Sequence, residues 1–411
     1  MNVSEHFVLR GGEIFTEGRP QSTHLPTASA TTSSQPGIGQ VTIDVLPDGA
    51  LLEIFHFFEG DLVNRISIFT WRWIELAHVC RRWRNVIFGL PQRLDVRLVC
   101  KNATPARTSP TLGIWPPFPI AVSCERMHWP GGGSSNVIAA FKHSDRISDV
   151  EIFNIDGSAL ENLVDMMQGP FPILRFFYLK SSDGSIPVVP ETFLGGSKPR
   201  LETFMLSGVP FLSFPKFVSS ALSIEFLSLR DIPNSGYISP ETMATCLAAL
   251  PNLSYLSIGF RSPLSRPIQI GPPPLTRSVL PALARLVFHG VSEYLEEFVA
   301  RIDAPLLYQL HVMLFMDPIF HIPRLHDFIQ RIEGLMPCNQ AFMEFTGPAI
   351  NIIFGSRAQF KMEVRCQGPD WQLSSVAQIS ASYCPSSLTS SNSRSARDFG
   401  RSIQGGKTTQ T

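Results

Sequence analysis

The residues that could do chemistry in this chain of 411 residues are scattered rather than grouped. Near the carboxyl end, residues 405–408 (GGKT) come close to a phosphate-binding loop, but the GxxxxGK[ST] pattern needs glycine where Arg401 stands. The three glycines at 131–133 lack the spacing of a dinucleotide-binding loop. The sequence also contains no HExxH and no GxSxG motif. These patterns indicate no hydrolase, kinase or dinucleotide enzyme.

Metal and redox chemistry have no stronger basis in the sequence. The seven cysteines lie far apart and form no CxxC pair, so neither a zinc site nor a disulfide framework is indicated. Free cysteines of this kind fit a reducing compartment. Single histidines such as His289 and His311 have no carboxylate or cysteine at ligand spacing, and we interpret them as core or surface residues. We therefore expect a protein that is not an enzyme and that holds no metal or cofactor.

Charge and hydropathy narrow the class of partner. Lys+Arg and Asp+Glu both number 34, so the formal net charge is zero, which gives no electrostatic reason to expect nucleic acid or an anionic membrane as partner. The chain has no basic amino-terminal region followed by an apolar core, and no apolar run of roughly 18 residues that could span a membrane. We expect a cytoplasmic or nuclear protein.

The composition divides the chain into segments. Residues 1–40 and 384–411 are too poor in apolar side chains to build a core, and we predict that both are disordered. Between them lie two differently patterned regions, 41–100 and 146–383, which a Pro-rich linker at 101–145 joins.

The first region has helical periodicity. Leu51, Ile54, Phe55 and Phe58 follow the i, i+3, i+4, i+7 spacing of one apolar helix face, and Pro47 suits the first turn of that helix. A second apolar stripe runs from Trp73 through Cys80 and on to Ile87. The pattern predicts a small module of two apolar helices.

Ordered motifs in this region resemble a known family. The leucine–proline pair at 46–47, the run LLEIF at 51–55 and the run AHVCRRWR at 77–84 resemble the F-box motif. The continuation FGLPQRLD at 88–95 is similar to the F-box family expanded in mushroom-forming fungi. The segment between Phe55 and Val79 is longer than the common pattern and carries Trp71 and Trp73. A helical hairpin with a buried Trp83 is the plainer alternative.

The resemblance implies a partner and a docking surface. An F-box binds a Skp-type adaptor and, through it, the cullin of a ubiquitin ligase. Carried onto this sequence, the motif implies that the following residues form or support the docking surface: Leu46, Pro47, Leu51, Ile54, Phe55, Val79, Cys80 and Trp83.

The second region repeats an LxxLxL-like pattern. Seven copies begin at Ile147, Leu174, Leu201, Ile224, Leu253, Leu283 and Leu307. Proline stands two residues before the first apolar position in five of the seven, whereas 34 prolines in 411 residues would place fewer than one there by chance. Since proline ends a helix and suits the start of an extended segment, each copy is predicted to be a strand.

Helical stripes separate these strands. Four of them centre on Leu163, Leu247, Phe298 and Phe328, and Ser239 and Ser292 are predicted caps. The fold class that follows is α+β overall: a small helical F-box followed by an irregular leucine-rich-repeat-like α/β solenoid. An α/β domain with another strand order is the alternative.

Alternate residues of the predicted strands would point away from the helices and offer a surface. A plain cover for the sheet is one interpretation of this row. The other is capture of an unknown protein target by Tyr178, Phe226, Arg230, Tyr255 and Arg285. The leading hypothesis is a substrate-receptor adaptor of a Skp–cullin–F-box ubiquitin ligase. The alternatives are an F-box scaffold acting outside any ligase and an enzyme with an unrecognised site.

Overall fold

The computed structural model describes residues 43–59, 72–89, 98–101, 117–125, 134–181, 189–196, 200–263, 274, 276–315, 322–335, 341–346, 349–354 and 360–365. The segments predicted to be disordered, 1–40 and 384–411, lie outside these residues. The chain divides into two units, Met1–Pro47 and Asp48–Thr411. In the first, Ile43–Val45 forms a 3-10 turn (η1), and Leu46 N–H donates to the Ile43 carbonyl at 3.2 Å.

The second unit opens with three helices. They are α1 (Asp48–Glu59), α2 (Arg72–Val79) and α3 (Arg81–Gly89). The predicted second helix is therefore divided, and Cys80 lies at the division. The Cys80 carbonyl accepts from Arg84 N–H at 3.1 Å, and its Sγ accepts from Trp83 N–H at 3.4 Å. The Cys80 Sγ thus satisfies the Trp83 N–H, a first-turn donor that would otherwise lack a partner within α3.

The three helices bury a common apolar core. Leu51 and Phe55 of α1 are fully buried, as the stripe predicted, but Leu52 is buried in place of Ile54, which is 44% exposed. Trp73, Leu76 and Ala77 of α2 and Val86 and Ile87 of α3 complete this core. The side chain of Phe58 lies outside the described residues.

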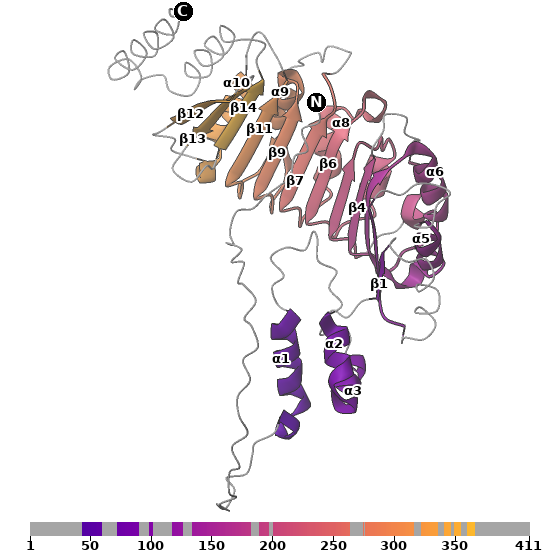
Figure 1. Cartoon of the computed structure of the whole chain (residues 1–411). Coiled ribbons are helices and arrows are strands. Elements are labelled where there is room, and N and C mark those ends of the chain that lie inside the picture. Colours follow the sequence, from indigo (N-terminus) through magenta and orange to yellow (C-terminus); the bar gives the residue numbers. More distant parts are fainter. Residues whose placement is uncertain are drawn as a thin grey trace, which may run out of the picture. The chain divides into compact units, whose positions relative to one another are not determined.

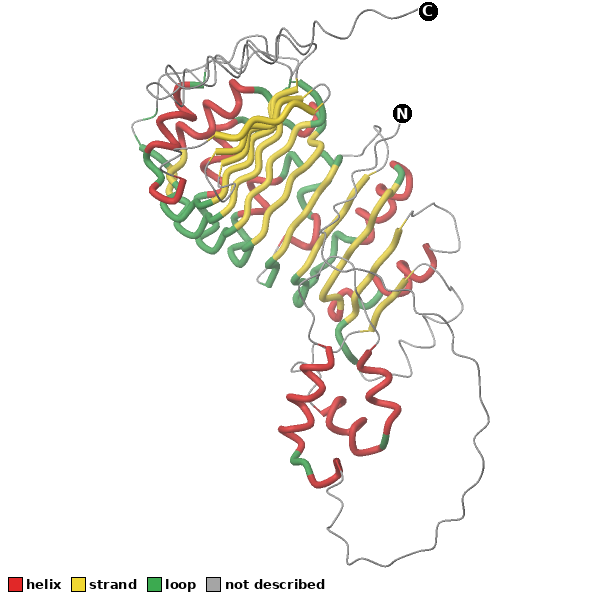
Figure 2. The backbone as a smooth tube through the Cα atoms, turned by 60° about the vertical axis from the view of Figure 1, so that its left-hand side comes forward, coloured by secondary structure: helices red, strands yellow, loops and turns green. Residues whose placement is uncertain are grey.

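A large, mostly parallel sheet follows. Among the described residues it has twelve strands in the order β1-β2-β3-β4-β5-β6-β7-β9-β11-β14-β13-β12 (Figures 1 and 2). Their bounds are β1 Leu98–Lys101, β2 Ile120–Glu125, β3 Ile147–Ile155, β4 Phe176–Ser181, β5 Thr203–Ser207, β6 Phe226–Ile232, β7 Tyr255–Phe260, β9 Arg285–Gly290, β11 Gln309–Leu314, β12 Ala341–Thr346, β13 Ala349–Phe354 and β14 Phe360–Arg365. Two short strands, β8 (Ser278–Val279) and β10 (Ile302–Asp303), form a separate parallel pair.

Helices between the strands cover one face of the sheet (Figure 1). They are α5 Ser134–Phe141, α6 Gly157–Met166, α7 Phe214–Val218, α8 Pro240–Leu247, α9 Ser292–Arg301 and α10 Pro323–Gln330. Short 3-10 turns are η3 Ser144–Arg146, η4 Phe193–Gly196, η5 Asn234–Gly236 and η6 Glu333–Leu335. The protein is therefore a mixed α and β structure built on one large sheet.

The core lies between this sheet and these helices. Alternate strand residues such as Phe177, Phe204 and Phe288 are fully buried. Phe204 contacts Phe217 of α7 with ring centroids 4.7 Å apart, and Phe288 contacts Tyr294 of α9 at 5.9 Å. Burying an apolar side chain of this size stabilises the fold by about 1.5–3 kcal/mol.

The sheet reaches beyond the predicted repeat region in both directions. β2 pairs in parallel with β3, and β1 pairs with β2, although residues 101–145 were expected to form a linker. This expectation was wrong for 120–125 and 134–141, because a short strand without the LxxLxL pattern still pairs when the edge of β3 is available. At the other end, β13 pairs antiparallel with both β14 and β12, and these three strands were not predicted.

The predicted helix caps had different outcomes. Ser239 caps α8, since its Oγ accepts from Thr242 N–H at 3.2 Å and Pro240 begins the helix. The predicted cap at Ser292 was wrong, because α9 begins one residue earlier than expected and Val291 stands at the cap position. The Ser292 hydroxyl instead donates to the Glu293 carboxylate at 3.3 Å.

Candidate functional site

The eight residues that the F-box resemblance implies are not equivalent in the structure. Leu51 and Phe55 are fully buried, and the Phe55 ring packs on half-buried Trp83 with centroids 4.8 Å apart. Cys80 is half-buried at the start of α3. These four residues support the module from inside. Ile54 and Val79, 44% and 59% exposed, lie on its surface, and Leu46 and Pro47 directly precede α1.

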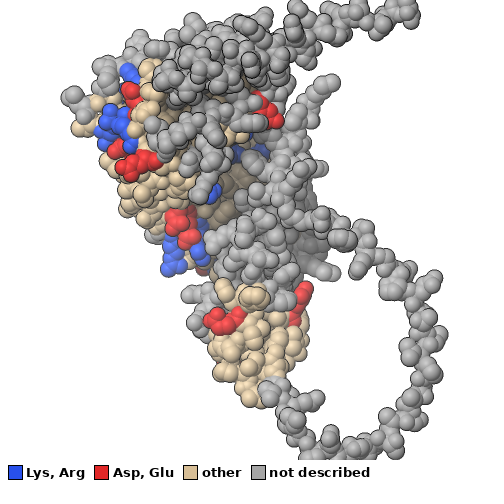
Figure 3. Space-filling view, turned by 90° about the vertical axis from the view of Figure 1, so that its left-hand side faces the viewer, with Lys and Arg blue, Asp and Glu red and all other residues tan. Residues whose placement is uncertain are grey.

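An exposed aromatic residue on α1 was not among the predicted residues. Phe57 is 86% exposed, and it stands three residues after exposed Ile54, so both lie on one side of the helix. In Figure 3 the described atoms of this module are mostly uncharged on the face shown. Ile54 and Phe57 of α1 and Val79 of α2 are the exposed large apolar side chains that the structure describes on these three helices, and this set is called the apolar patch below.

The arginines of α3 hold the three helices together. Arg82 donates from Nη2 and Nε to Asp48 Oδ1, at 2.7 and 3.2 Å, and thus joins α3 to α1. Arg84 Nε donates to the Ala77 carbonyl at 3.0 Å and joins α3 to α2.

The second candidate surface is the face of the sheet opposite the helices, called the second face below. Parallel register aligns its side chains in rows across the strands. Phe176, Thr203, Phe226, Tyr255, Arg285 and Gln309 form one row. Tyr178, Met205, Ser228, Ser257, Val287, His311 and Lys361 form the next.

Three of the five predicted target-binding residues form one cluster. The rings of Phe226 and Tyr255 stack with centroids 4.0 Å apart and an interplanar angle of 2°. Arg230 Nη2 donates to the Tyr255 hydroxyl at 3.5 Å, and Arg230 Nε donates to Ser257 Oγ at 3.3 Å. The cluster presents a flat aromatic pair beside a guanidinium group that its hydrogen bonds hold in place.

The other two predicted residues have different neighbours. The Tyr178 ring meets Phe153 edge-on with centroids 4.8 Å apart. Burial raises the pKa of Tyr178, although the charge of Arg230 opposes that shift. Arg285 lies in register with Tyr255, but its Nε donates to the Tyr308 hydroxyl at 2.7 Å. Tyr178 and Arg285 therefore lie outside the Phe226–Arg230–Tyr255 cluster.

Charged residues of the second face were only partly anticipated. His289 and His311 are half-buried there, and the His289 ring lies 4.6 Å from that of Phe315. Lys361 of β14 is the register partner of His311. No sequence pattern pointed to Lys361, because its strand lies after the last LxxLxL copy.

The described residues offer little for covalent or metal chemistry. None of them form a group of three or more His, Cys, Asp or Glu side chains able to hold a metal ion. Burial raises the pKa of the Cys100 thiol to about 11 and also raises that of Cys246, so both stay protonated near neutral pH. Of the helices in the described ranges, none has the length and apolar character needed to cross a membrane.

Comparison of the chain with protein-family models and with curated proteins found no match in either case.

Proposed function

We propose that this chain is a substrate-receptor adaptor of a Skp–cullin–F-box ubiquitin ligase. Its helical module would bind the Skp-type adaptor, and the sheet would hold a protein target. The observation that carries the proposal is the apolar patch: Ile54, Phe57 and Val79 are 44%, 86% and 59% exposed on a module that already has its own core. These positions fall within or beside the motif that resembles the F-box.

The energetics of the apolar patch support a protein partner. Burying a large apolar side chain stabilises an interface by about 1.5–3 kcal/mol. A few such anchors usually dominate helix-mediated recognition. Because Phe55 and Trp83 pack beneath α1, the helix can present Ile54 and Phe57 without rearranging.

The sheet supports the second half of the proposal. From β3 to β11, an α-helix follows β3, β5, β6 and β9 and a 3-10 turn follows β4, an order that supports a leucine-rich-repeat-like solenoid. The helices occupy one face, and the aromatic cluster with Arg230 lies on the other. Tyrosine and arginine are enriched among residues that dominate binding energy.

In this proposal the chain performs no bond-making step. It would bring target lysines close to the ubiquitin-conjugating enzyme, which raises their effective concentration. Such a role places the protein in the cytoplasm or the nucleus.

The test is complex formation between the full chain and a Skp-type adaptor, measured by size-exclusion chromatography of the co-expressed pair. We expect Ile54→Asp with Phe57→Asp to abolish the complex, because two charges would enter an apolar interface. Leu212→Asp is the matched control, since Leu212 is 51% exposed but lies between β5 and α7. A double variant that binds like the control, or a wild-type chain that binds no adaptor, would contradict the proposal.

A second measurement separates this function from that of an F-box scaffold outside any ligase. Once a target is known, its lifetime in cells should lengthen when the double variant replaces the wild-type chain. A target that stays bound but whose lifetime does not change would favour the scaffold.

A further inference from the structure

The second face carries a strip of basic side chains from β6 to β14. Its members are Arg230, His289, His311 and Lys361, called the basic strip below. His311 and Lys361 are direct register partners on neighbouring strands, and β9, which carries His289, pairs with β11 on its other side. Neighbouring strands lie about 4.8 Å apart, so these side chains emerge close together.

His311 lies at the centre of the basic strip in an unusual state. Its Nε2 atom is buried and has no hydrogen-bond partner among the described residues. Burial, together with the charges of Lys361, Arg230 and His289, lowers the pKa of His311 to about 4. A buried ring nitrogen without a partner, next to cations, is a place where an anion would be stabilised.

The carboxylates of the second face near the strip have other contacts. Glu363 of β14 makes an ion pair with Arg365 at 3.8 Å. Asp231 accepts a hydrogen bond from Ser207 Oγ at 2.7 Å. Farther along the face, Asp149 and Glu151 of β3 are only 5% and 3% exposed. The face is therefore basic from β6 to β14 and acidic at β3.

This charge distribution selects the kind of anion. A long polyanion along the rows would meet Asp149 and Glu151, whereas a short acidic segment fits the basic strip alone. The stacked rings of Phe226 and Tyr255 adjoin Arg230 and offer apolar contact to residues that flank the acid. A protein segment supplies both kinds of group.

We propose that the basic strip binds an acidic segment of a protein, with a carboxylate or a phosphorylated side chain placed between His311 and Lys361. As target recognition, the inference rests on the proposed function; as an anion site, it rests on the strip alone. The ligand anion would accept hydrogen bonds from the Lys361 ammonium and from the His311 ring, and Arg230 would add long-range attraction.

The experiment uses the full chain and three short fluorescent peptides in a fluorescence-anisotropy titration. One peptide contains Glu, Leu and Tyr, the second has Gln in place of Glu, and the third has one phosphoserine in place of a Glu. We expect the Glu and phosphoserine peptides to bind, the Gln peptide to bind far more weakly, and added salt to weaken binding. The ratio of the first and third affinities tells which anion the strip prefers.

Variants locate the binding. Lys361→Gln should lower the affinity for the Glu peptide about tenfold, which corresponds to about 1.4 kcal/mol. Lys361→Arg should retain most of that affinity. His311→Phe removes the hydrogen-bond donor of the ring and should also lower the affinity for the Glu peptide. Lys216→Gln is the matched control, because Lys216 is an exposed cation of α7 paired with Glu191. Melting temperatures of all variants exclude unfolding as the cause.

The outcomes separate this inference from the proposed function. Equal affinities of Lys361→Gln and Lys216→Gln for the Glu peptide would overturn the assignment of the basic strip as an anion site. So would a wild-type chain that binds no peptide, even if the Skp-type adaptor still binds. Loss of adaptor binding with intact peptide binding would contradict the ligase role alone. An oligothymidine that displaces the peptide and binds more tightly would also overturn the assignment to a protein segment.

Discussion

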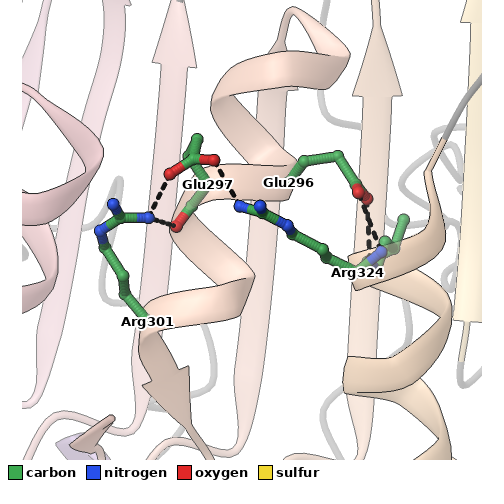
Figure 4. Close-up of polar contacts among 5 residues, drawn as sticks. Glu296, Glu297, Arg301 and Arg324 are labelled. Carbon is green, nitrogen blue, oxygen red and sulfur yellow. Dashed lines mark hydrogen bonds and ion pairs between the residues drawn. The ribbon is translucent and has the colours of Figure 1, made fainter. Parts of the chain in front are cut away.

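The carboxylate of Glu296 in α9 accepts hydrogen bonds from the backbone N–H of Arg324, at 2.8 Å, and from that of Leu325, at 2.9 Å (Figure 4). Both donors belong to the first turn of α10, where N–H groups have no partner within the helix. One helix thus caps the next. Beside it, Glu297 forms ion pairs with both Arg301 and Arg324, and both glutamates are only 2% exposed.

We predict that Glu296→Ala lowers the free energy of unfolding by about 1–3 kcal/mol, because it leaves two buried N–H donors without acceptors. Glu296→Gln should cost less, since its amide oxygen can still accept one hydrogen bond. Urea denaturation followed by circular dichroism measures both. Glu161→Gln, a change at an exposed position of α6, is the control and should stay within about 0.5 kcal/mol of the wild type. A Glu296→Ala midpoint equal to that of the control would show that the cap is dispensable.

Replacing Phe55 and replacing Phe57 by alanine are predicted to differ strongly in their effect on stability. Phe55 is fully buried against Trp83, so Phe55→Ala should destabilise the helical module by about 3–5 kcal/mol. Phe57 is 86% exposed, so Phe57→Ala should leave stability within about 0.5 kcal/mol of the wild type. Tryptophan fluorescence during urea unfolding includes this module through Trp73 and Trp83, and the other four of the six tryptophans contribute the same background in both variants. Equal losses for the two variants would contradict the assigned faces of α1.

The spacing of apolar residues predicted the interior of the sheet well. The LxxLxL pattern, with a proline before five of its seven copies, located β3 to β7, β9 and β11, because a strand buried on one side needs alternate apolar residues. The four helical stripes were confirmed as α6, α8, α9 and α10. These elements share one feature: their own local pattern suffices to define them.

Elements that depend on distant neighbours could not be predicted in this way. β12 to β14 pair antiparallel and lack the repeat pattern, whereas β2 depends on its pairing with β3 and β1 on its pairing with β2. Glu296 and Glu297 would be assigned to the solvated side of α9 by type alone. Their burial follows from Arg324, which arrives from the next helix.

On the candidate surfaces too, a local pattern predicted some residues, whereas others depend on pairing between distant segments. Alternation in the strands predicted that Phe226, Arg230 and Tyr255 would share the second face, and the rows contain them. Lys361 joins that face only through the pairing of β14 with β11. Phe57 was missed because helix α1 buries Leu52 rather than Ile54. The buried face is therefore rotated about the helix axis relative to the predicted stripe, and four apolar positions were too few to show this.

Gly334 is predicted to tolerate no side chain. A methyl group at this position would lie 2.6 Å from the carbonyl oxygen of Leu307, which is backbone and cannot turn aside. Gly334→Ala should therefore lower the melting temperature clearly, with a cost of about 1–3 kcal/mol for overpacking. Gly169→Ala is the matched control, because no atom lies within 4 Å of the position of its methyl group. Differential scanning calorimetry of the two variants tests the contact between η6 and the turn before β11.

The stability of the folded chain is predicted to depend on pH through His311. The folded chain holds the pKa of His311 at about 4, below the ordinary value of 6.5, through burial and through Lys361 of β14, Arg230 of β6 and His289 of β9. Between pH 6.5 and about 4 the unfolded chain therefore binds a proton that the folded chain does not bind. The free energy of unfolding should fall as the pH is lowered through this window, by up to about 1.4 kcal/mol for each pH unit. Above pH 6.5 the ring is neutral in both states, so His311 causes no loss of stability there.

The test compares urea unfolding of the wild type with that of His311→Gln across the same window. The variant lacks the titrating ring, so its stability should depend less steeply on pH. Met313→Leu alters a neighbouring side chain of β11 but keeps the imidazole, and it should retain the wild-type slope. Because a bound anion would raise the pKa of His311, the acidic Glu peptide should also flatten the slope of the wild type and leave that of His311→Gln unchanged. Identical slopes for the wild type and His311→Gln would show that His311 does not govern the acid sensitivity of this sheet.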